Sequence, residues 1–213
     1  ETKESFKPQL LSLLSGLHAE KVFFLTDDDM FIDDVDILDF SRFETRTTIV
    51  SLRMGNHLMR CYPVQKSQRL PEFIACDNSA TDKLCWIWNS GEHDWNYPLS
   101  VNGHLFHTKE MLALAESTEF HSPNTFEANI QVFSKFFTHR LGVCYKRSKI
   151  LNVPINKVQL DNDNVHGSVH QDFLLNQWNE GLQMDYRALY GLVNESAHQE
   201  VPITFIQRTD RQH

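Results

Sequence analysis

The sequence predicts a mixed α/β fold in a single domain over residues 1–213. Short apolar runs rich in β-branched and aromatic residues alternate with longer stretches whose apolar residues lie three or four positions apart. No internal repeat, low-complexity tract or Gly/Ser/Pro-rich linker separates these segments. Hydrophobic residues make up 41% of the chain and charged residues 23%, which is typical of a globular protein and excludes fibrous and disordered classes.

Four segments are expected to be helices. In residues 5–18, apolar side chains recur at helical spacing, and Pro8 suits a first turn. The other three follow a residue that favours a helix start. They are 109–116 after Thr108, 123–137 after Ser122 with Pro123 first, and 168–180 with a Ser168 and Gln171 capping box and Gly181 at the end.

Seven apolar runs are expected to be strands. The first, 21–26 (KVFFLT), is short and apolar, as in a buried parallel strand, and leads directly into three aspartates. The others are 47–54, 84–88, 101–106, 142–146, 149–153 and 201–207. Their alternation with helices indicates the mixed α/β class.

The net charge of −8 comes almost entirely from one acidic segment, residues 27–39, which contains no Lys or Arg. Its seven carboxylates are Asp27, Asp28, Asp29, Asp33, Asp34, Asp36 and Asp39. Apolar residues alternate with them, so the segment is expected to fold, with the last four in turns and caps. The chain has no cluster of basic residues, which argues against a nucleic-acid partner.

The cysteines and the hydropathy predict a cytoplasmic location. Cys61, Cys76, Cys85 and Cys144 show no CxxC spacing and are expected to be buried free thiols in a reducing compartment. The longest apolar runs have about four residues, far below the ~20 that span a bilayer. A transmembrane segment is therefore not expected, while peripheral membrane contact stays open.

The aspartates after the first strand predict a cation site. Ligands bind beyond the carboxyl ends of strands in open α/β sheets, and Mg²⁺ and Mn²⁺ prefer oxygen ligands. Alternate residues of an extended segment point the same way, so Asp27 and Asp29 are expected to share a metal or a metal-bound diphosphate. An alternative is a metal-dependent phosphohydrolase with Asp27 as nucleophile, although Phe31 departs from that motif.

Two further segments have compositions that suit a ligand site. Asp94, Trp95 and Tyr97 in EHDWNYP combine polar and aromatic groups, as a site for a sugar ring does; the alternative places Trp95 in the core. Asn102 and Gly103 mark either a point where the backbone admits a donor or a bulge.

Taken together, these motifs resemble the nucleotide-sugar glycosyltransferases of the GT-A fold, in particular a bacterial subset. Their signature is an apolar strand that ends in Asp-x-Asp, here residues 27–29. The motifs TIVSLRMGNH, WIWNSGEHDWNYPLSVNGHLF, SPNTFEANI, NVPINKVQ and NVHG follow in order. The resemblance extends from about Lys21 to about Arg208.

The resemblance implies a mainly parallel, mixed sheet flanked by helices, and a metal-dependent transferase that moves a sugar from a nucleotide-diphosphate donor to an acceptor hydroxyl with inversion. Asp29 would bind Mn²⁺ or Mg²⁺, Asp27 the metal or the donor ribose, and Asp28 the donor. Glu127 would be the catalytic base, or instead a capping partner of Asn124. His166 in NVHG would complete the metal site.

The chain departs from the family in one respect. Only one helix precedes the strand that leads into Asp27, whereas GT-A domains begin with strand–helix units that bind the nucleotide base. These units are expected to be missing from this chain, which would make it an N-terminally incomplete portion of the domain. A non-catalytic carbohydrate-binding or scaffold domain of the same fold is therefore a second hypothesis.

Overall fold

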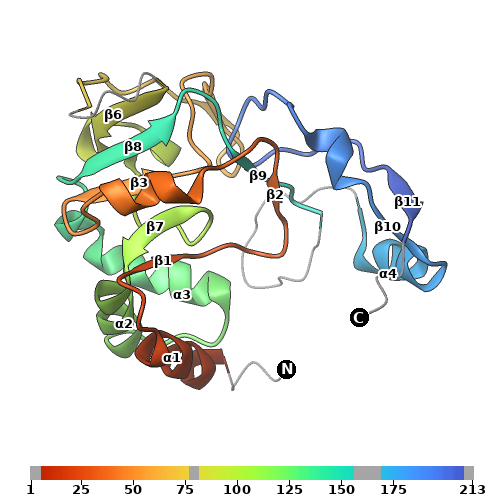
Figure 1. Ribbon diagram of the computed structural model, residues 1–213, viewed down its shortest axis with the longest axis horizontal. Coiled ribbons are helices and arrows are strands. Elements are labelled where there is room, and N and C mark those ends of the chain that lie inside the picture. The colour runs from red at the N-terminus through yellow and green to blue at the C-terminus, as the bar shows by residue number, and fades with distance from the viewer. Residues whose placement is uncertain (1–5, 77–81, 156–168, 209–213) are drawn as a thin grey trace.

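The computed structural model describes residues 6–76, 82–155 and 169–208, and a five-stranded sheet lies at its centre (Figure 1). The strand order is β1-β7-β3-β8-β6. The bounds are β1 (Lys21–Phe23), β3 (Thr48–Ser51), β6 (Lys83–Ile87), β7 (His104–His107) and β8 (Leu141–Tyr145). The mixed α/β class is confirmed.

The expectation of a mainly parallel sheet is wrong. Only β3 and β8 are parallel neighbours, whereas β1–β7, β3–β7 and β6–β8 are antiparallel pairs. The reason is topological, because β7 inserts between β1 and β3 and runs against both of them. The strands β1, β3 and β8 therefore share one direction, and β7 and β6 run the opposite way.

The expected helices form close to their predicted bounds, as α1 (Phe6–Gly16), α2 (Thr108–Glu116), α3 (Pro123–Ile130) and α4 (Gln171–Asn179). Ser122 caps α3 through a capping box with Thr125, and the 3₁₀-helix η5 (Gln131–Phe136) replaces the predicted continuation to residue 137. Gly181 follows α4 with φ +80°, as a glycine after a helix end commonly does. Within the described ranges, no helix has the length and apolar character needed to cross a bilayer.

Three small sheets supplement the central one. They pair β2 (Asp29–Phe31) with β9 (Ile150–Asn152), β4 (Arg60–Cys61) with β5 (Lys66–Ser67), and β10 (Leu182–Met184) with β11 (Phe205–Gln207). The β2–β9 register sets Asp29 opposite Asn152, which brings the acidic segment to a strand far along the chain. The group α4, β10 and β11, here called the distal arm, lies away from the five-stranded sheet (Figure 1).

Both faces of the central sheet are covered. Successive residues of β3 face opposite ways, so Ile49 packs in the core with α1, α2 and α3, whereas Val50 packs with Phe40 and Ile150 on the other face. The first core contains a tryptophan cluster in which the Trp86 ring lies 4.7 Å from that of Trp88 and 5.0 Å from that of Trp95.

Two of the four cysteines are not free thiols, so the expectation of four free thiols is wrong for these two. Cys76 and Cys85 form a disulfide, with their Cα atoms 5.5 Å apart, while Cys61 and Cys144 are buried free thiols. The pairing arises because the Ile74 N–H donates to the Cys85 carbonyl at 2.8 Å, which lays the segment before Cys76 beside β6. The two cysteines are nine residues apart, a spacing that matches no disulfide or metal motif.

Candidate functional site

A pocket of about 520 Å³ opens beyond the carboxyl end of β1 and reaches α3 and the segment that follows β9. Five of the residues predicted for the site line it, namely Asp28, Asp94, Tyr97, Asn102 and Glu127. Three lining residues that the sequence did not indicate are Arg53, Asn152 and His198. The pocket thus brings together groups from segments that are far apart in the sequence.

The aspartates adopt a turn rather than an extended strand. The Asp29 N–H donates to the Thr26 carbonyl at 3.1 Å, so residues 27–28 occupy the turn. Asp27 is exposed and does not line the pocket. Instead, the Asn152 Nδ2 donates to Asp28 Oδ1 at 2.8 Å and to Asp29 Oδ1 at 3.2 Å. The expected convergence of Asp27 with Asp29 is replaced by that of Asp28 with Asp29.

The two converging carboxylates are partly buried, and desolvation raises the pKa of each. Hydrogen bonds from Thr26 and Asn152 act in the opposite direction for both groups. A bound cation would relieve the cost of holding two carboxylates there. Asp28 lines the pocket, whereas Asp29 is outside the lining and reaches it only beside Asp28. The pair fits a Mg²⁺ or Mn²⁺ ion that also binds a diphosphate, because such ions often use only one or two protein carboxylates.

The described side chains do not form a complete metal site by themselves. Among the residues that the structure describes, no three His, Cys, Asp or Glu side chains gather in a geometry suited to a metal. The predicted ligand His166 lies outside the described residues. The cation hypothesis therefore depends on phosphate oxygens as further ligands.

Glu127 faces the pocket from the second half of α3. Its Oε2 accepts a hydrogen bond from the Val101 N–H at 2.6 Å and one from the Ser100 hydroxyl at 3.4 Å. Burial raises the pKa of this carboxyl, although the Val101 bond and the charge of Arg53 oppose the shift. The proposed capping role beside Asn124 is not observed, since the α3 cap is formed by Ser122.

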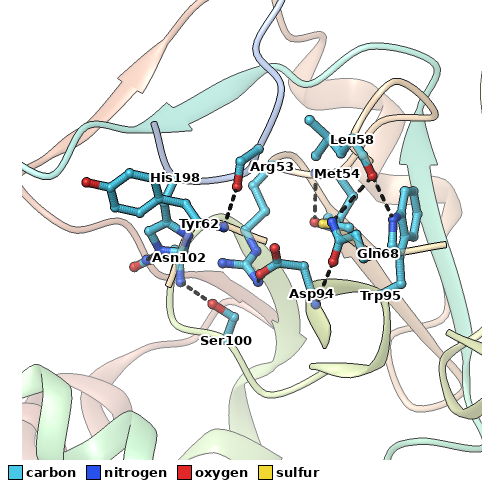
Figure 2. Close-up of polar contacts among 12 residues, drawn as sticks. Arg53, Met54, Leu58, Tyr62, Gln68, Asp94, Trp95, Ser100, Asn102 and His198 are labelled. Atoms are coloured by element: carbon cyan, nitrogen blue, oxygen red, sulfur yellow. Dashed lines mark hydrogen bonds and ion pairs between the residues drawn. The ribbon is translucent and has the colours of Figure 1, made fainter. Parts of the chain in front are cut away.

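Arg53 and Asp94 form a buried ion pair in the pocket wall (Figure 2). Arg53 Nη2 lies 3.0 Å from Asp94 Oδ1, and the two residues are 2% and 5% exposed. Arg53 Nε and Asp94 Oδ2 are buried atoms without a hydrogen-bond partner among the described residues. The Cys61 thiol lies beside the pair, and burial together with Asp94 raises its pKa to about 12.

Trp95 and Gly103 are outside the pocket lining and serve the core instead. Trp95 is fully buried, and its indole N–H donates to the Leu58 carbonyl at 3.3 Å (Figure 2). Gly103 has φ +67°, and a Cβ atom there would lie 2.0 Å from Ile150 Cδ1. Glycine is therefore required by the backbone and by close packing, which accounts for Gly103 without a ligand.

Asn102 lies between Thr26 and His198, and all three residues line the pocket. Asn102 Oδ1 accepts from the Thr26 hydroxyl at 3.2 Å, and Asn102 Nδ2 lies 3.4 Å from His198 Nε2 (Figure 2). Burial, with the nearby charge of Arg53, lowers the pKa of His198 to about 4, so its ring is neutral at pH 7. No sequence motif indicates His198. Arg53 could have been recognised from the sequence, because it is a cation within an apolar run.

Comparison of the chain with protein-family models, curated proteins and solved structures found no match. The fold and the pocket are therefore described from the structure alone. That geometry gives an α/β protein with a polar pocket lined by three carboxylates, from Asp28, Asp94 and Glu127.

Proposed function

We propose that this chain is the catalytic region of a metal-dependent glycosyltransferase, which transfers a sugar from a nucleotide-diphosphate donor to an acceptor hydroxyl. One observation carries the proposal, which is that Asp28 and Glu127 line the same pocket with Asn102. A cation-binding carboxylate and a separate carboxylate that can act as base are the two groups that such a transfer requires.

The acidic end of the pocket would hold the donor diphosphate. Asp28 and Asp29 would bind Mn²⁺ or Mg²⁺, and Asn152 keeps both carboxylates oriented through its amide. When bound, the cation supplies stabilisation of the negative charge that develops on the leaving diphosphate. Asn102, beside Thr26, is placed to contact the donor next to this group.

Glu127 would act as the general base. The acceptor hydroxyl gives its proton to the Glu127 carboxylate, its oxygen bonds to the sugar C1, and the bond from C1 to the diphosphate breaks. A raised pKa strengthens a carboxylate as a base, and burial supplies that shift here. The Val101 N–H fixes the orientation of the group. A single base opposite the leaving group supports inversion at C1.

Calorimetric titration tests the acidic end. Wild-type protein, Asp28→Asn and Asp172→Asn would be titrated with UDP and with GDP, each with MnCl₂. Asp172, an exposed residue of α4, is a control with the same change in charge. We expect binding at least about tenfold weaker for Asp28→Asn and unchanged for Asp172→Asn. Equal binding by all three proteins would reject the metal–diphosphate assignment.

Donor hydrolysis tests the base. We expect Glu127→Gln to lower the turnover of the donor that binds by roughly 10²-fold or more, the usual contribution of a general base. Glu116→Gln, an exposed change at the end of α2, should leave turnover at the wild-type level. Full activity in Glu127→Gln would exclude a catalytic role for this carboxylate.

A non-catalytic carbohydrate-binding domain is the second candidate. It is favoured by the absence, within the described residues, of three side chains gathered around a metal position. Sugar binding without donor turnover in any Mn²⁺ or Mg²⁺ condition would support it. No observation favours the phosphohydrolase, because Asp27 is exposed and lies outside the pocket lining.

The cytoplasmic prediction loses part of its basis. It depended on four free thiols, and two of these form the Cys76–Cys85 disulfide. Stable disulfides are rare in reducing compartments. We therefore propose a reaction for this protein but no cellular compartment.

A further inference from the structure

We infer that Arg53 and Asp94 bind two neighbouring hydroxyl groups of an uncharged sugar in this pocket. The inference deepens the proposed function by naming its substrate class, and it rests on that function only in treating the sugar as the transferred group or the acceptor. Arg53 is thus assigned a positioning and specificity role that the sequence motifs do not suggest.

The unpaired atoms of the buried ion pair carry the inference. Arg53 Nε is a donor and Asp94 Oδ2 an acceptor, and both are buried without a hydrogen-bond partner among the described residues, apart from the weak thiol donor of Cys61, which interacts with the Asp94 carboxylate. Both side chains are more than nine-tenths buried and both line the pocket. A buried polar atom without a partner is unfavourable, because it has lost its hydrogen bonds to water and gained none in the protein. A pocket ligand that offers one acceptor and one donor would satisfy the two atoms together.

A vicinal diol has this chemistry. Each hydroxyl both donates and accepts a hydrogen bond. One hydroxyl can donate to Asp94 Oδ2 while its neighbour accepts from Arg53 Nε. The two protein atoms belong to one ion pair joined at 3.0 Å, so groups on adjacent carbons suit them better than groups on distant parts of a ligand.

The charges of the lining favour an uncharged ligand. Among the described residues that line the pocket, Arg53 is the only Arg or Lys, and Asp94 already offsets its charge. Asp28 and Glu127 add two further carboxyl groups. His198 carries no compensating charge, since burial holds its pKa near 4. A carboxylate on the ligand would therefore meet like charges from Asp28 and Glu127, and the described lining offers it no Arg or Lys that is not already paired.

Titration of the wild-type protein tests the inference. Methyl glycosides of glucose, galactose, mannose and N-acetylglucosamine would be titrated without metal and followed by ¹⁵N–¹H correlation spectra. The best ligand would then be compared with its uronic acid and with each of its monodeoxy analogues. We expect at least about tenfold weaker binding for the uronic acid, and for the deoxy analogues at two adjacent positions only.

Three results would overturn the inference. They are equal binding of the uronic acid, indifference to every deoxy substitution, and no spectral change with any glycoside at about 100 mM, a concentration well above a millimolar dissociation constant. Each is obtained with unmodified protein, so the test does not depend on the folding of a variant.

A matched pair of variants tests whether Arg53 binds the glycoside. Arg53→Lys keeps the positive charge but removes the Nε donor, and it should weaken glycoside binding at least about tenfold. Arg69→Lys makes the same change in the exposed Arg69–Glu92 ion pair and should leave binding unchanged. Wild-type affinity in a folded Arg53→Lys protein would exclude Arg53, and if that variant does not fold, the wild-type ligand series decides.

The outcomes separate this inference from the proposed function. Glycoside binding with the expected selectivity, but without donor turnover, would contradict the transferase and leave the diol site in place. Donor turnover with a nucleotide-linked uronic acid, but without selective glycoside binding, would overturn the diol site alone.

Discussion

Asn152 is the residue on which the acidic end of the pocket depends. Its side-chain amide donates to Asp28 and Asp29, and its backbone bonds to Ala197 and Gln199 on either side of His198. One residue thus fixes the aspartate turn and the histidine relative to each other. Polar side chains with several partners commonly specify such arrangements, because each unmade bond would leave a buried group unsatisfied.

The pH dependence of Glu127 gives a residue-scale prediction. Burial raises its pKa above the ordinary 4.5, so over the interval between the two values the folded protein holds a proton that the unfolded chain has lost. Stability from this group is therefore greatest below pH 4.5 and falls as pH rises through that interval. Glutamine removes the ionisation and keeps an oxygen for the Val101 N–H.

Thermal unfolding of wild-type protein and Glu127→Gln between pH 4 and pH 8 checks this expectation. The advantage of Glu127→Gln in Tm should grow as pH rises above 4.5, where about 1 kcal/mol corresponds to about 2–4 °C in a chain of this size. The difference between wild-type protein and Glu116→Gln, exposed in both states, should stay flat. A constant difference for Glu127→Gln would show that its carboxyl is not destabilised by burial.

At this scale, the sequence predicted that two of the aspartates after the first strand lie together, but not which two. The prediction assumed an extended segment, in which Asp27 and Asp29 point the same way. The Thr26–Asp29 turn breaks that rule and exposes Asp27. Turn formation depends on the pairing of β2 with β9, a contact more than a hundred residues away in the sequence and therefore invisible to local patterns.

At the scale of elements, β8 is fitted to its neighbour β6 by a glycine. Gly142 lies opposite Trp86, and a Cβ atom at Gly142 would lie 2.4 Å from the Trp86 ring. Trp86 is fully buried within the tryptophan cluster, so it has no free space into which it could move. The packing of β8 against the edge strand β6 therefore depends on a glycine, without a side chain, at position 142.

We expect Gly142→Ala to destabilise the protein by about 1–3 kcal/mol or more, because it overpacks the core at Trp86. Gly16→Ala is the matched control, since no atom lies within 4 Å of a Cβ added at the end of α1. That variant should be neutral or up to about 1 kcal/mol more stable. Urea unfolding measures both, and equal stability of the two variants would contradict this account of β8.

Helices and strands differ in how well the sequence predicts them. The α3 start follows from local chemistry, because Ser122 and Pro123 act within one turn. The strands β2 and β10 have three residues each, and their partners β9 and β11 are distant in the sequence, so no local pattern marks them. The antiparallel insertion of β7 is likewise a property of the assembled sheet.

At the scale of the whole molecule, burial is unevenly distributed. The two large clusters cover the faces of the central sheet, and a third smaller cluster around Ile32 and Leu151 lies beside β2 and β9. In the distal arm, α4 has no buried residue, and its ring contact between Phe173 and Phe205 is 5.7 Å between centroids. Regions with few buried contacts open at lower free energy than the core.

Hydrogen exchange followed by mass spectrometry checks this difference. The helices α2 and α4 both have nine residues, but α2 buries Thr108, Met111, Leu114 and Ala115. We expect amides of α4 to exchange at least about tenfold faster than those of α2, because they require only local opening. Equal protection of the two helices would mean that the distal arm opens only with the entire protein.

The distribution of the four tryptophans gives the chain a spectroscopic property. Trp86, Trp88 and Trp95 are fully buried, whereas Trp178 in α4 is 54% exposed, with the Arg208 guanidinium 3.8 Å from the ring centroid. Iodide can reach Trp178 but not the cluster. The quenchable part of the intrinsic fluorescence therefore reports on the distal arm, and the remaining emission reports on the sheet core, without an attached dye.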